Sequence, residues 1–448
     1  MKFLRIFFVS LFIATVDFSS ANFSIIRDAE IEEFLTEMLK SVFKVAGLRP
    51  KSAKVYVINS DVINAFTIGN GYVFVNSGLL LKFENPLHLL GILCHETGHI
   101  AAGHIDRQIN AINRSSKNCA WAMLAGILGS IFTGSAEVMA LPLGYAMTDE
   151  RFFLRFTRGE EFAADALAAA YLEKSGYGSD VLIEAFDVFQ RLDILNGGVN
   201  LPVYVQSHPK TSDRISALQK RAKSKKFRAS DETSRKYRHI LVKLKAYLKR
   251  LDWRTALPED DYSRAVYFHR IGRSKEAVEI LRGLLKKNPK DFYCKETLAQ
   301  TLYEAGQLEE SIKIYEEICG KDTNALIKTD YANVLIEAGQ RIDFAISLLE
   351  SAKYEECFNS DIFRLLAKGY GKQKREGLAL LMLAQEQMLL RNYRTALELL
   401  SVSLDKLDKN TEKKHIKKAK YLKELVGREN FNLTTRLIFF LSEISMRC

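Results

Sequence analysis

The sequence predicts an α+β chain that is mostly helical and has two parts. Two short runs of β-branched and aromatic residues predict a small sheet near the N-terminus. A His-Glu-x-x-His motif in a segment of helical periodicity predicts a helix beside that sheet. A period of 34 residues after residue 258 predicts an all-α repeat array in the second half.

The bulk composition fits a folded protein with more than one domain. The chain has 448 residues, 47% of them hydrophobic and 27% charged, which is enough for two or three domains with their own cores and excludes wholesale disorder. The six cysteines form no Cys-x-x-Cys pair and have no repeated spacing, so they predict neither a disulfide framework nor a cysteine zinc site.

The first 21 residues, MKFLRIFFVSLFIATVDFSSA, predict a secretory signal peptide. Lys2 and Arg5 precede an apolar run over 6–16, and Ser19 and Ala21 are small residues at the expected cleavage positions. The mature protein is then expected in an exported compartment, the periplasm in a double-membraned bacterium. A retained membrane anchor is the alternative, although the apolar run is short for a membrane span.

Five elements are expected before residue 220. Apolar residues at helical spacing predict an amphipathic helix over 28–46. The runs AKVYVINS and GYVFVNSG predict two strands, the second opened by the turn signal Gly69-Asn70-Gly71. Two more helices are expected, over 86–109 and 158–174.

The residues LCHETGH carry the chemistry of the first part. At about 100° per residue, His95 and His99 lie about 40° apart on one helix face, so both imidazoles can reach one tetrahedral Zn²⁺. Glu96 lies beside them as a candidate general base. His104 follows His95 by nine residues, about half a turn away in angle, and is expected to face elsewhere as a structural or surface histidine.

The segment TRGEEFAADALAA offers a third ligand. Glu161 and Asp165 are one helical turn apart, so Glu161 can enter the metal shell while Asp165 orients a ligand histidine from behind. An exposed acidic turn is the alternative, because Glu160 precedes them. The apolar surroundings of Asp165 count against it, since a buried carboxylate needs partners.

An uncharged segment, 118–136, separates the two halves of this expected site. It is just long enough to span a membrane. A single crossing would put the two halves on opposite sides, so a buried or membrane-surface helical hairpin is favoured over an integral-membrane protein.

A basic segment joins the two parts. Residues 220–250 hold 13 Lys and Arg against Asp231 and Glu232. A solvated basic helix that links two domains is favoured, and peripheral contact with acidic lipid headgroups is the alternative. Nucleic acid is a poor partner for an exported protein.

The second half repeats small, large and glycine positions at a fixed interval, which is typical of a tetratricopeptide (TPR) array, and a generic helical bundle is the alternative. The aligned positions are Ala277, Ser311 and Ala345; Leu281, Tyr315 and Leu349; and Gly272 and Gly306, with Gly339 one residue short. RNYRTALELL, 391–400, is a further unit that extra residues around 352–385 put out of phase.

Four motifs in order resemble the zinc endopeptidases that include HtpX and the CAAX prenyl protease. They are INAFTIGNGYVFVNSGLL, HETGH, Glu161-Phe-Ala-Ala-Asp165 and the HPKTSDRI of 208–215. The signal peptide and repeats make the chain most similar to the periplasmic BepA-like branch. The resemblance implies a zincin-type domain, in which helices accompany a small sheet with an edge strand, followed by a TPR solenoid.

The resemblance also implies site residues and one Zn²⁺ per chain. His95, His99 and Glu161 would bind zinc, and Glu96 would be the base. His208 would be catalytic, either occupying the open zinc position or stabilising the oxyanion, and Asp165 and Arg214 would support the ligands. The strand with Tyr72, Val73, Phe74, Val75 and Asn76 would pair with an extended substrate through its backbone.

The expected protein is therefore a gluzincin-type metalloendopeptidase in four segments. They are a signal peptide over 1–21, a peptidase domain over 22–219, a basic helical linker over 220–257 and a TPR domain over 258–448. It would cut unfolded or misassembled proteins during outer-membrane protein assembly and dock partners on its repeats. The rival function is a chaperone or assembly scaffold in which proteolysis is rare.

Overall fold

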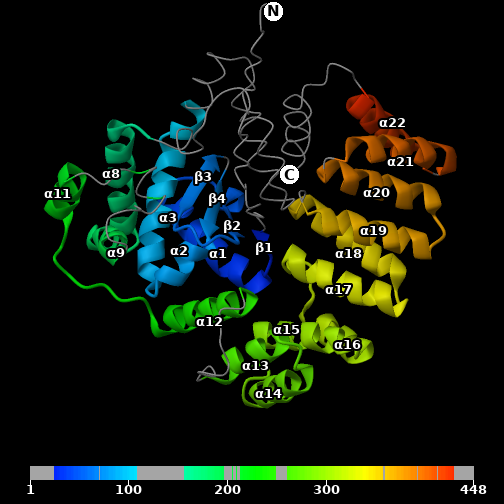
Figure 1. Ribbon diagram of the computed structural model, residues 1–448, viewed down its shortest axis with the longest axis horizontal. Coiled ribbons are helices and arrows are strands. Elements are labelled where there is room, and N and C mark those ends of the chain that lie inside the picture. The colour runs from blue at the N-terminus through cyan, green and yellow to red at the C-terminus, as the bar shows by residue number, and fades with distance from the viewer. Residues whose placement is uncertain are drawn as a thin grey trace, which may run out of the picture.

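The protein is mostly helical with one small sheet, as predicted (Figure 1). The computed structural model describes residues 25–69, 71–107, 156–195, 204, 208, 212–248, 260–356, 359–390, 392–410 and 412–427. The predicted signal peptide and the uncharged segment 118–136 lie outside the described residues. None of the helices described is both long and apolar enough to cross a membrane.

The sheet has four strands in the order β1-β2-β4-β3. Strand β2 runs parallel to β4, whereas β1–β2 and β3–β4 are antiparallel pairs. Valines of β2 and β4 are buried in the core on one face, and aromatic rings of β2, β3 and β4 stack on the other. The strands are β1 (Ile25–Ile26), β2 (Lys54–Ile58), β3 (Ala65–Gly69) and β4 (Tyr72–Asn76).

Strand β4 is not an edge strand, which corrects the expected substrate-pairing strand. It is hydrogen-bonded to β2 on one side and β3 on the other, so its backbone has no free side for an extended peptide. The tight turn at Gly71, with φ of 87°, folds β3 onto its outer side. Among the strands described, β1 and β3 are the outer ones.

The helices of the first part form a single core with the sheet. Helix α1 contacts β2 and α3, while α3 also contacts β3, α8 and α9. Asp28 caps the start of α1 by accepting a hydrogen bond from the Ile31 N–H at 2.9 Å. The helices are α1 (Ala29–Ala46), α2 (Ser77–Lys82), α3 (Pro86–Ala101), α8 (Arg158–Lys174), α9 (Asp180–Leu195), α11 (Ser212–Arg221) and α12 (Asp231–Tyr247).

Helix α3 is shorter than the helix predicted over 86–109. It ends at Ala101, and Gly103 then adopts the left-handed conformation with φ of 65°. Glycine enters this region at little cost, which is why such residues often end helices. The chain therefore changes direction before His104.

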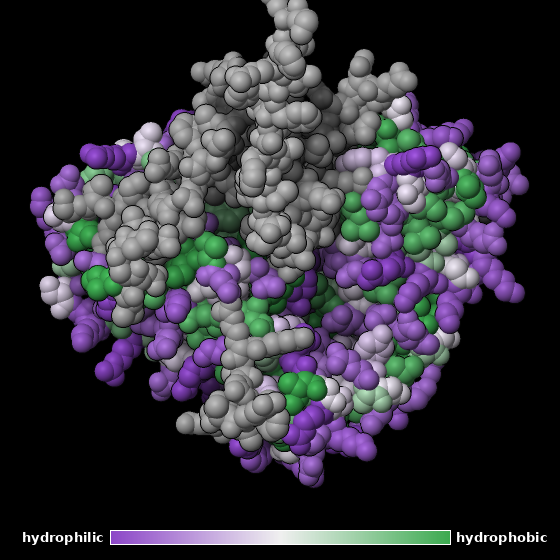
Figure 2. Space-filling view, viewed as in Figure 1, coloured by the Kyte–Doolittle hydropathy of each residue, from purple (hydrophilic) through white to green (hydrophobic). Residues whose placement is uncertain are grey.

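The basic segment is more than a solvated linker, because one face of α12 is buried in the core of the first part. Tyr237, Ile240 and Leu244 are fully buried there, and the Tyr237 hydroxyl donates to the Phe83 carbonyl at 2.8 Å. The polar face stays in solvent, and hydrophilic residues dominate the outer rim of both parts of the molecule (Figure 2).

The second part is an array of helices in which each packs on the next. It curves from α13 below the sheet to α22 at the opposite end (Figure 1). The helices are α13 (Asp261–Arg270), α14 (Ser274–Lys287), α15 (Phe292–Glu304), α16 (Leu308–Ile318), α17 (Ala325–Ala338), α18 (Ile342–Glu355), α19 (Ser360–Lys372), α20 (Glu376–Leu389), α21 (Tyr393–Lys406) and α22 (Lys413–Gly427).

The positions of the 34-residue period have one structural role in each unit. Ala277, Ser311 and Ala345 are fully buried on α14, α16 and α18, where a small side chain allows close packing. Glycines take the left-handed conformation in the turn before each of these helices. Ala396 is also fully buried, but it lies three helices after Ala345 rather than two, which explains the change of phase.

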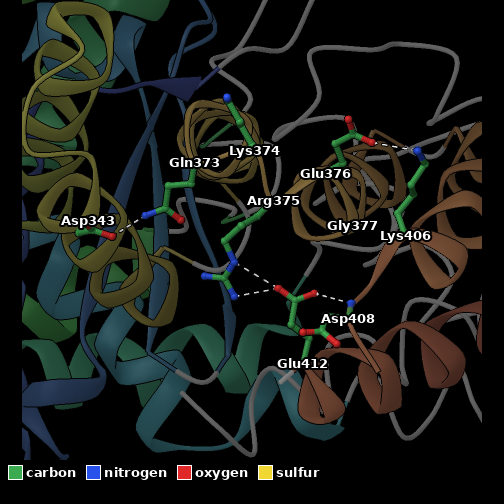
Figure 3. A pocket seen from close by; sticks show the side chains of 9 residues that line it. All are labelled: Asp343, Gln373, Lys374, Arg375, Glu376, Gly377, Lys406, Asp408 and Glu412. Atoms are coloured by element: carbon green, nitrogen blue, oxygen red, sulfur yellow. Dashed lines mark hydrogen bonds and ion pairs between the residues drawn. The ribbon is translucent and has the colours of Figure 1, made fainter. Parts of the chain in front are cut away.

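A surface pocket lies near the end of the array (Figure 3). Several of its charged side chains neutralise one another. Arg375 pairs with Glu412 at 2.8 Å and Lys406 pairs with Glu376 at 3.1 Å.

Buried charges connect the two parts. The Lys243 ammonium of α12 lies 3.1 Å from Asp28 and 2.9 Å from Glu30 at the start of α1, and 3.7 Å from Glu296 of α15. Lys243 is only 3% exposed, so solvent does little to screen these contacts.

A second set of charged residues also joins the two parts. Glu356, at the end of α18, accepts hydrogen bonds from Arg27 at 2.6 Å and from Lys54 of β2. Arg27 also pairs with Glu32 at 2.6 Å. The array is therefore attached to the junction between β1 and α1 and to β2.

Replacing Lys243 with methionine should strongly destabilise the protein, because the carboxylates of Asp28 and Glu30 would lose their buried counter-charge. We expect a loss of about 3–5 kcal/mol in the free energy of unfolding, measured with urea. The matched control is Lys236→Met on the same helix. Lys236 is 57% exposed and pairs with Glu232 alone among the residues that the structure describes, so its loss should cost under about 0.5 kcal/mol. Equal losses in both variants would contradict the buried role of Lys243.

Glu296 should make stability depend on pH. Burial is the main cause that raises its pKa from the ordinary 4.5 to about 8, so the native state holds this proton more tightly than the unfolded chain. The contribution of Glu296 to the free energy of unfolding is complete below about pH 4.5 and is lost as the pH rises through 8. In Glu296→Gln the fall in unfolding free energy over this range should be shallower, by up to about 1.4 kcal/mol per pH unit. Identical slopes in urea titrations would refute this.

Candidate metal centre

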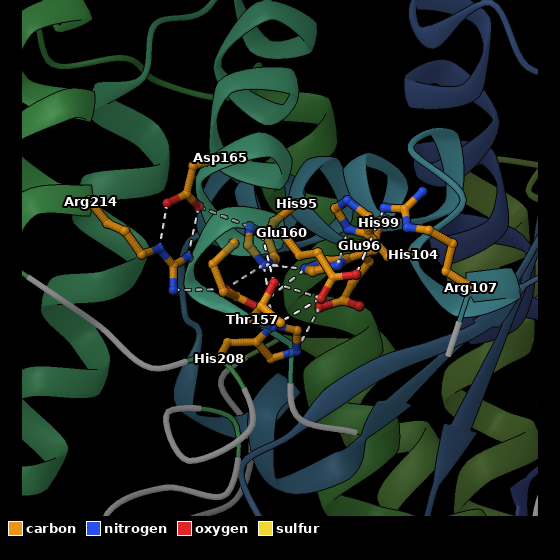
Figure 4. A network of polar contacts seen from close by, with 11 residues as sticks. His95, Glu96, His99, His104, Arg107, Thr157, Glu160, Asp165, His208 and Arg214 are labelled. Carbon is orange, nitrogen blue, oxygen red and sulfur yellow. Dashed lines mark hydrogen bonds and ion pairs between the residues drawn. The ribbon is translucent and has the colours of Figure 1, made fainter. Parts of the chain in front are cut away.

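Three helices and one short segment bring the predicted site residues together (Figure 4). Helix α3 supplies the three residues of the His-Glu-x-x-His motif, α8 supplies Glu161 and Asp165, and α11 supplies Arg214. His208 lies in the segment before α11. All of these side chains are buried.

Gly98 permits the close approach of α3 to α8. A Cβ built on Gly98 would lie 2.8 Å from the carbonyl oxygen of Ala164 and 3.0 Å from its Cα. Any side chain there would collide with the backbone of α8. The glycine inside the HETGH motif therefore sets the distance between the two helices that carry the histidines and Glu161.

Helix α8 begins in a way that directs Glu161 inward. Thr157 and Glu160 form a capping box, in which the Glu160 N–H donates to Thr157 Oγ1 and the Thr157 N–H donates to Glu160 Oε2 at 2.9 Å. The next residue, Glu161, is 1% exposed and faces α3. The alternative of an exposed acidic turn is therefore wrong for Glu161.

Four side chains could hold a metal ion: His95, His99, Glu161 and His208. His95 Nε2 lies 3.1 Å from His99 Nε2 and 3.3 Å from His208 Nδ1. The Glu161 carboxylate oxygens lie 2.9 Å from His208 Nδ1 and 3.5 Å from each of the other two Nε2 atoms.

These distances fit a tetrahedral ion. Zinc binds histidine nitrogen and carboxylate oxygen at about 2.0–2.1 Å, so neighbouring donors in a tetrahedron lie about 3.3 Å apart. The donor set of three imidazoles and one carboxylate is also one that suits zinc.

Asp165 holds His95 from the outer side. Its Oδ1 lies 3.0 Å from His95 Nδ1, and it accepts two hydrogen bonds from Arg214 at 2.6 and 2.8 Å. Burial opposes ionisation of Asp165, but the hydrogen bonds from Arg214 and His95 outweigh it and lower its pKa. Arg214 also lies 2.7 Å from Glu161, so one guanidinium orients both carboxylates.

His104 belongs to the site, and the expectation that it faces away is wrong. It is 2% exposed, and its Nδ1 lies 2.9 Å from His99 Nδ1. The helical angle did not apply because α3 ends at Ala101. The Gly103 that precedes His104 is the sequence signal that could have located this helix end.

Glu96 is fully buried, and its carboxylate lies 3.7 Å from His208 Nε2. Burial is the main cause that raises the pKa of Glu96 to about 8, against the opposing effects of His95 and the Tyr204 hydroxyl. A buried carboxyl with a raised pKa beside a metal cluster is typical of a general base.

Two aromatic residues of the site had no signal in the sequence. Tyr204 is 1% exposed and stacks on His208, with ring centroids 4.6 Å apart. Phe156 lies over His99 at a centroid distance of 3.7 Å. A single tyrosine or phenylalanine outside a motif resembles any core residue, so only the structure places them here.

Replacing Gly98 with alanine should separate α3 from α8, because the new methyl group has no space against Ala164. We expect a loss of about 1–3 kcal/mol in stability and a clear fall in zinc affinity, measured by competition with a chromogenic chelator. Gly159→Ala is the matched control, since a Cβ at Gly159 of α8 would meet nothing within 4 Å. Zinc affinity that is unchanged in Gly98→Ala would contradict this role.

Comparison with known proteins supports this chemistry. The beta-barrel assembly-enhancing protease of Yersinia pestis is 23% identical over 341 residues, 71% of this chain and 68% of that protein. A putative beta-barrel assembly-enhancing protease of Vibrio cholerae is 25% identical over 202 residues, 45% of this chain and 41% of that protein. The mitochondrial metalloendopeptidase OMA1 of Arabidopsis thaliana is 28% identical over 200 residues, 43% of this chain and 36% of that protein.

The first part of the chain also matches a known protein family. Residues 26–222 match peptidase family M48, and this range contains strands β2, β3 and β4 and every residue of the metal cluster. The resemblance read from the four motifs is thereby confirmed. Residues 26–222 of this chain are a peptidase family M48 domain.

Proposed function

We propose that this protein is a zinc-dependent metalloendopeptidase that hydrolyses peptide bonds of unfolded or misassembled proteins. The observation that carries the proposal is the set of four buried donors, all within 4.8 Å of one another, with the buried carboxylate of Glu96 beside them. Its place within residues that match a peptidase family supports the reaction class.

Zinc would be held by His95, His99 and Glu161, and His208 would reversibly fill the fourth position. Four protein ligands close a tetrahedral zinc site, whereas a catalytic site keeps one position open. The position of His208 Nδ1, 2.9 Å from Glu161, supports the first of the two roles expected for it. Withdrawal of His208 would open the site to substrate.

The chain's own groups would move the protons. Glu96 would accept a proton from the attacking water and return it to the leaving amine. A bound zinc ion would supply Lewis-acid chemistry and lower the pKa of water. Once His208 withdraws, its imidazole and the nearby Tyr204 hydroxyl are candidate donors to the oxyanion. Asp165 and Arg214 would keep the ligands oriented.

The substrate would pair with β3 rather than with the strand first expected. β3 is an outer strand among those described, and it contacts α3, which carries the motif. Backbone pairing with an extended peptide reads little sequence and requires an unfolded segment. This preference fits a quality-control protease better than one with a defined cleavage sequence.

The helical array would dock partners as a TPR domain. The buried small residues on α14, α16 and α18 support this assignment. The names of the Yersinia and Vibrio relatives point to β-barrel assembly, and the signal-peptide pattern points to the periplasm. The rival proposal is a scaffold for assembly in which the array carries the function.

Replacing Glu96 with glutamine tests the proposal, because an amide cannot accept the proton. Wild-type protein should contain zinc and cleave an unfolded protein such as reduced casein. The variant should retain zinc and cleave it about 10²–10⁴-fold more slowly. Glu160→Gln is the control, since glutamine still forms the capping box of α8. Metal-free wild-type protein, or equal cleavage by both, would refute a zinc peptidase.

The same variant separates the enzyme from the scaffold. If proteolysis carries the function, Glu96→Gln should fail to restore outer-membrane protein assembly in cells that lack the protein. Full restoration by this variant would favour the scaffold.

A further inference from the structure

We propose that His104 is a positioning residue of the metal centre, which holds the ligand His99 in place by accepting a hydrogen bond from its outer ring nitrogen. This inference rests on the proposed zinc site and assigns a role to a residue outside the four motifs. His104 would touch neither substrate nor metal.

The three proposed ligands each have an outer partner. Asp165 lies 3.0 Å from Nδ1 of His95, and Arg214 lies 2.7 Å from Glu161. His104 Nδ1 lies 2.9 Å from Nδ1 of His99. Outer partners of this kind fix the ring orientation and the tautomer of a metal ligand.

The proton positions follow from the direction of each ring. His99 turns Nε2 toward the cluster, 3.1 Å from His95 Nε2, so Nε2 must keep its lone pair for the metal. A neutral His99 then carries its proton on Nδ1 and can donate it outward. His104 can accept only through an unprotonated Nδ1, so its own proton must be on Nε2.

The backbone brings His104 to this position. The Ala102 N–H still bonds to the Gly98 carbonyl at 3.0 Å, and left-handed Gly103 then redirects the chain. A residue with a side chain would adopt that conformation only with backbone strain. Phe156 lies against both imidazoles, with ring centroids 3.7 Å from His99 and 6.1 Å from His104.

A neutral acceptor suits this side of the site. The centre already contains the carboxyl groups of Glu96, Glu161 and Asp165, all buried. A further carboxylate behind His99 would add a buried negative charge at high desolvation cost. An imidazole provides the same hydrogen bond without the charge.

The test uses two substitutions that separate packing from hydrogen bonding. His104→Phe keeps a ring against Phe156 but removes the acceptor, whereas His104→Asn places an amide oxygen near the position of Nδ1. We would measure zinc affinity of the full chain by chelator competition and the visible spectrum of the Co²⁺-substituted protein. His104→Phe should weaken zinc binding about 10–100-fold and change the Co²⁺ bands. His104→Asn should recover most of the affinity and the wild-type bands.

His88 provides the matched control on the same helix. It lies about two turns before His95, and its Nε2 is 3.5 Å from Glu184. His88→Phe and His88→Asn should leave zinc affinity and the Co²⁺ spectrum unchanged. If His104→Phe does not fold, His104→Leu provides a second variant without an acceptor.

The outcomes separate this inference from the proposed function. Wild-type protein that binds no zinc would refute the proposed function and the inference together. Zinc binding by the wild type with unchanged affinity in His104→Phe would refute the inference alone. Equal weakening by the phenylalanine and asparagine variants would also refute it, because His104 would then act only through its shape.

Discussion

The contact between Gly98 and Ala164 is the constraint on which the metal centre depends. Because Gly98 has no side chain, α3 lies close to the backbone of α8. The Glu161 side chain of α8 can therefore reach the histidines of α3. Two histidines one turn apart on α3 then face a carboxylate from the first turn of α8. A wider spacing would leave Glu161 short of the histidines and Asp165 short of His95. Strand β3 and helix α9 also pack against α3.

Three of the four donors in the cluster have a partner outside it, which offsets part of the cost of burying them. The donors of the cluster are at most 4% exposed, so none of them relies on bulk water. Arg214 offsets the charges of two carboxylates, and the outer nitrogens of His95 and His99 lie against Asp165 and His104. The same logic holds between the two parts of the molecule, where Lys243 joins α12 to carboxylates of α1 and α15. Charge pairing in a low-dielectric interior thus orders the site and attaches the array.

Much of the fold was predictable because its signals are local. Apolar periodicity located the helices that became α1 and α8, and β-branched runs located β2 and β4, since each pattern depends only on neighbouring residues. The 34-residue period was equally visible, and its small residues are buried where close helix packing needs them. The order of the strands was not visible, because a run such as 72–76 has the same composition in the middle of a sheet as at its edge. The buried face of α12 was hidden by the lysines and arginines around it.

The sequence by itself determined the candidate donors His95, His99 and Glu161 and the carboxylate Glu96, because helical spacing places His95 beside His99 and Glu161 beside Asp165. The tertiary structure decided what surrounds them. It brought His208 and Tyr204 to the cluster, placed Arg214 between two carboxylates, and returned His104 to His99 after the helix had ended. These contacts join residues from separate elements or across a change of direction at Gly103. Their geometry depends on how whole elements pack, which no local pattern in the sequence records.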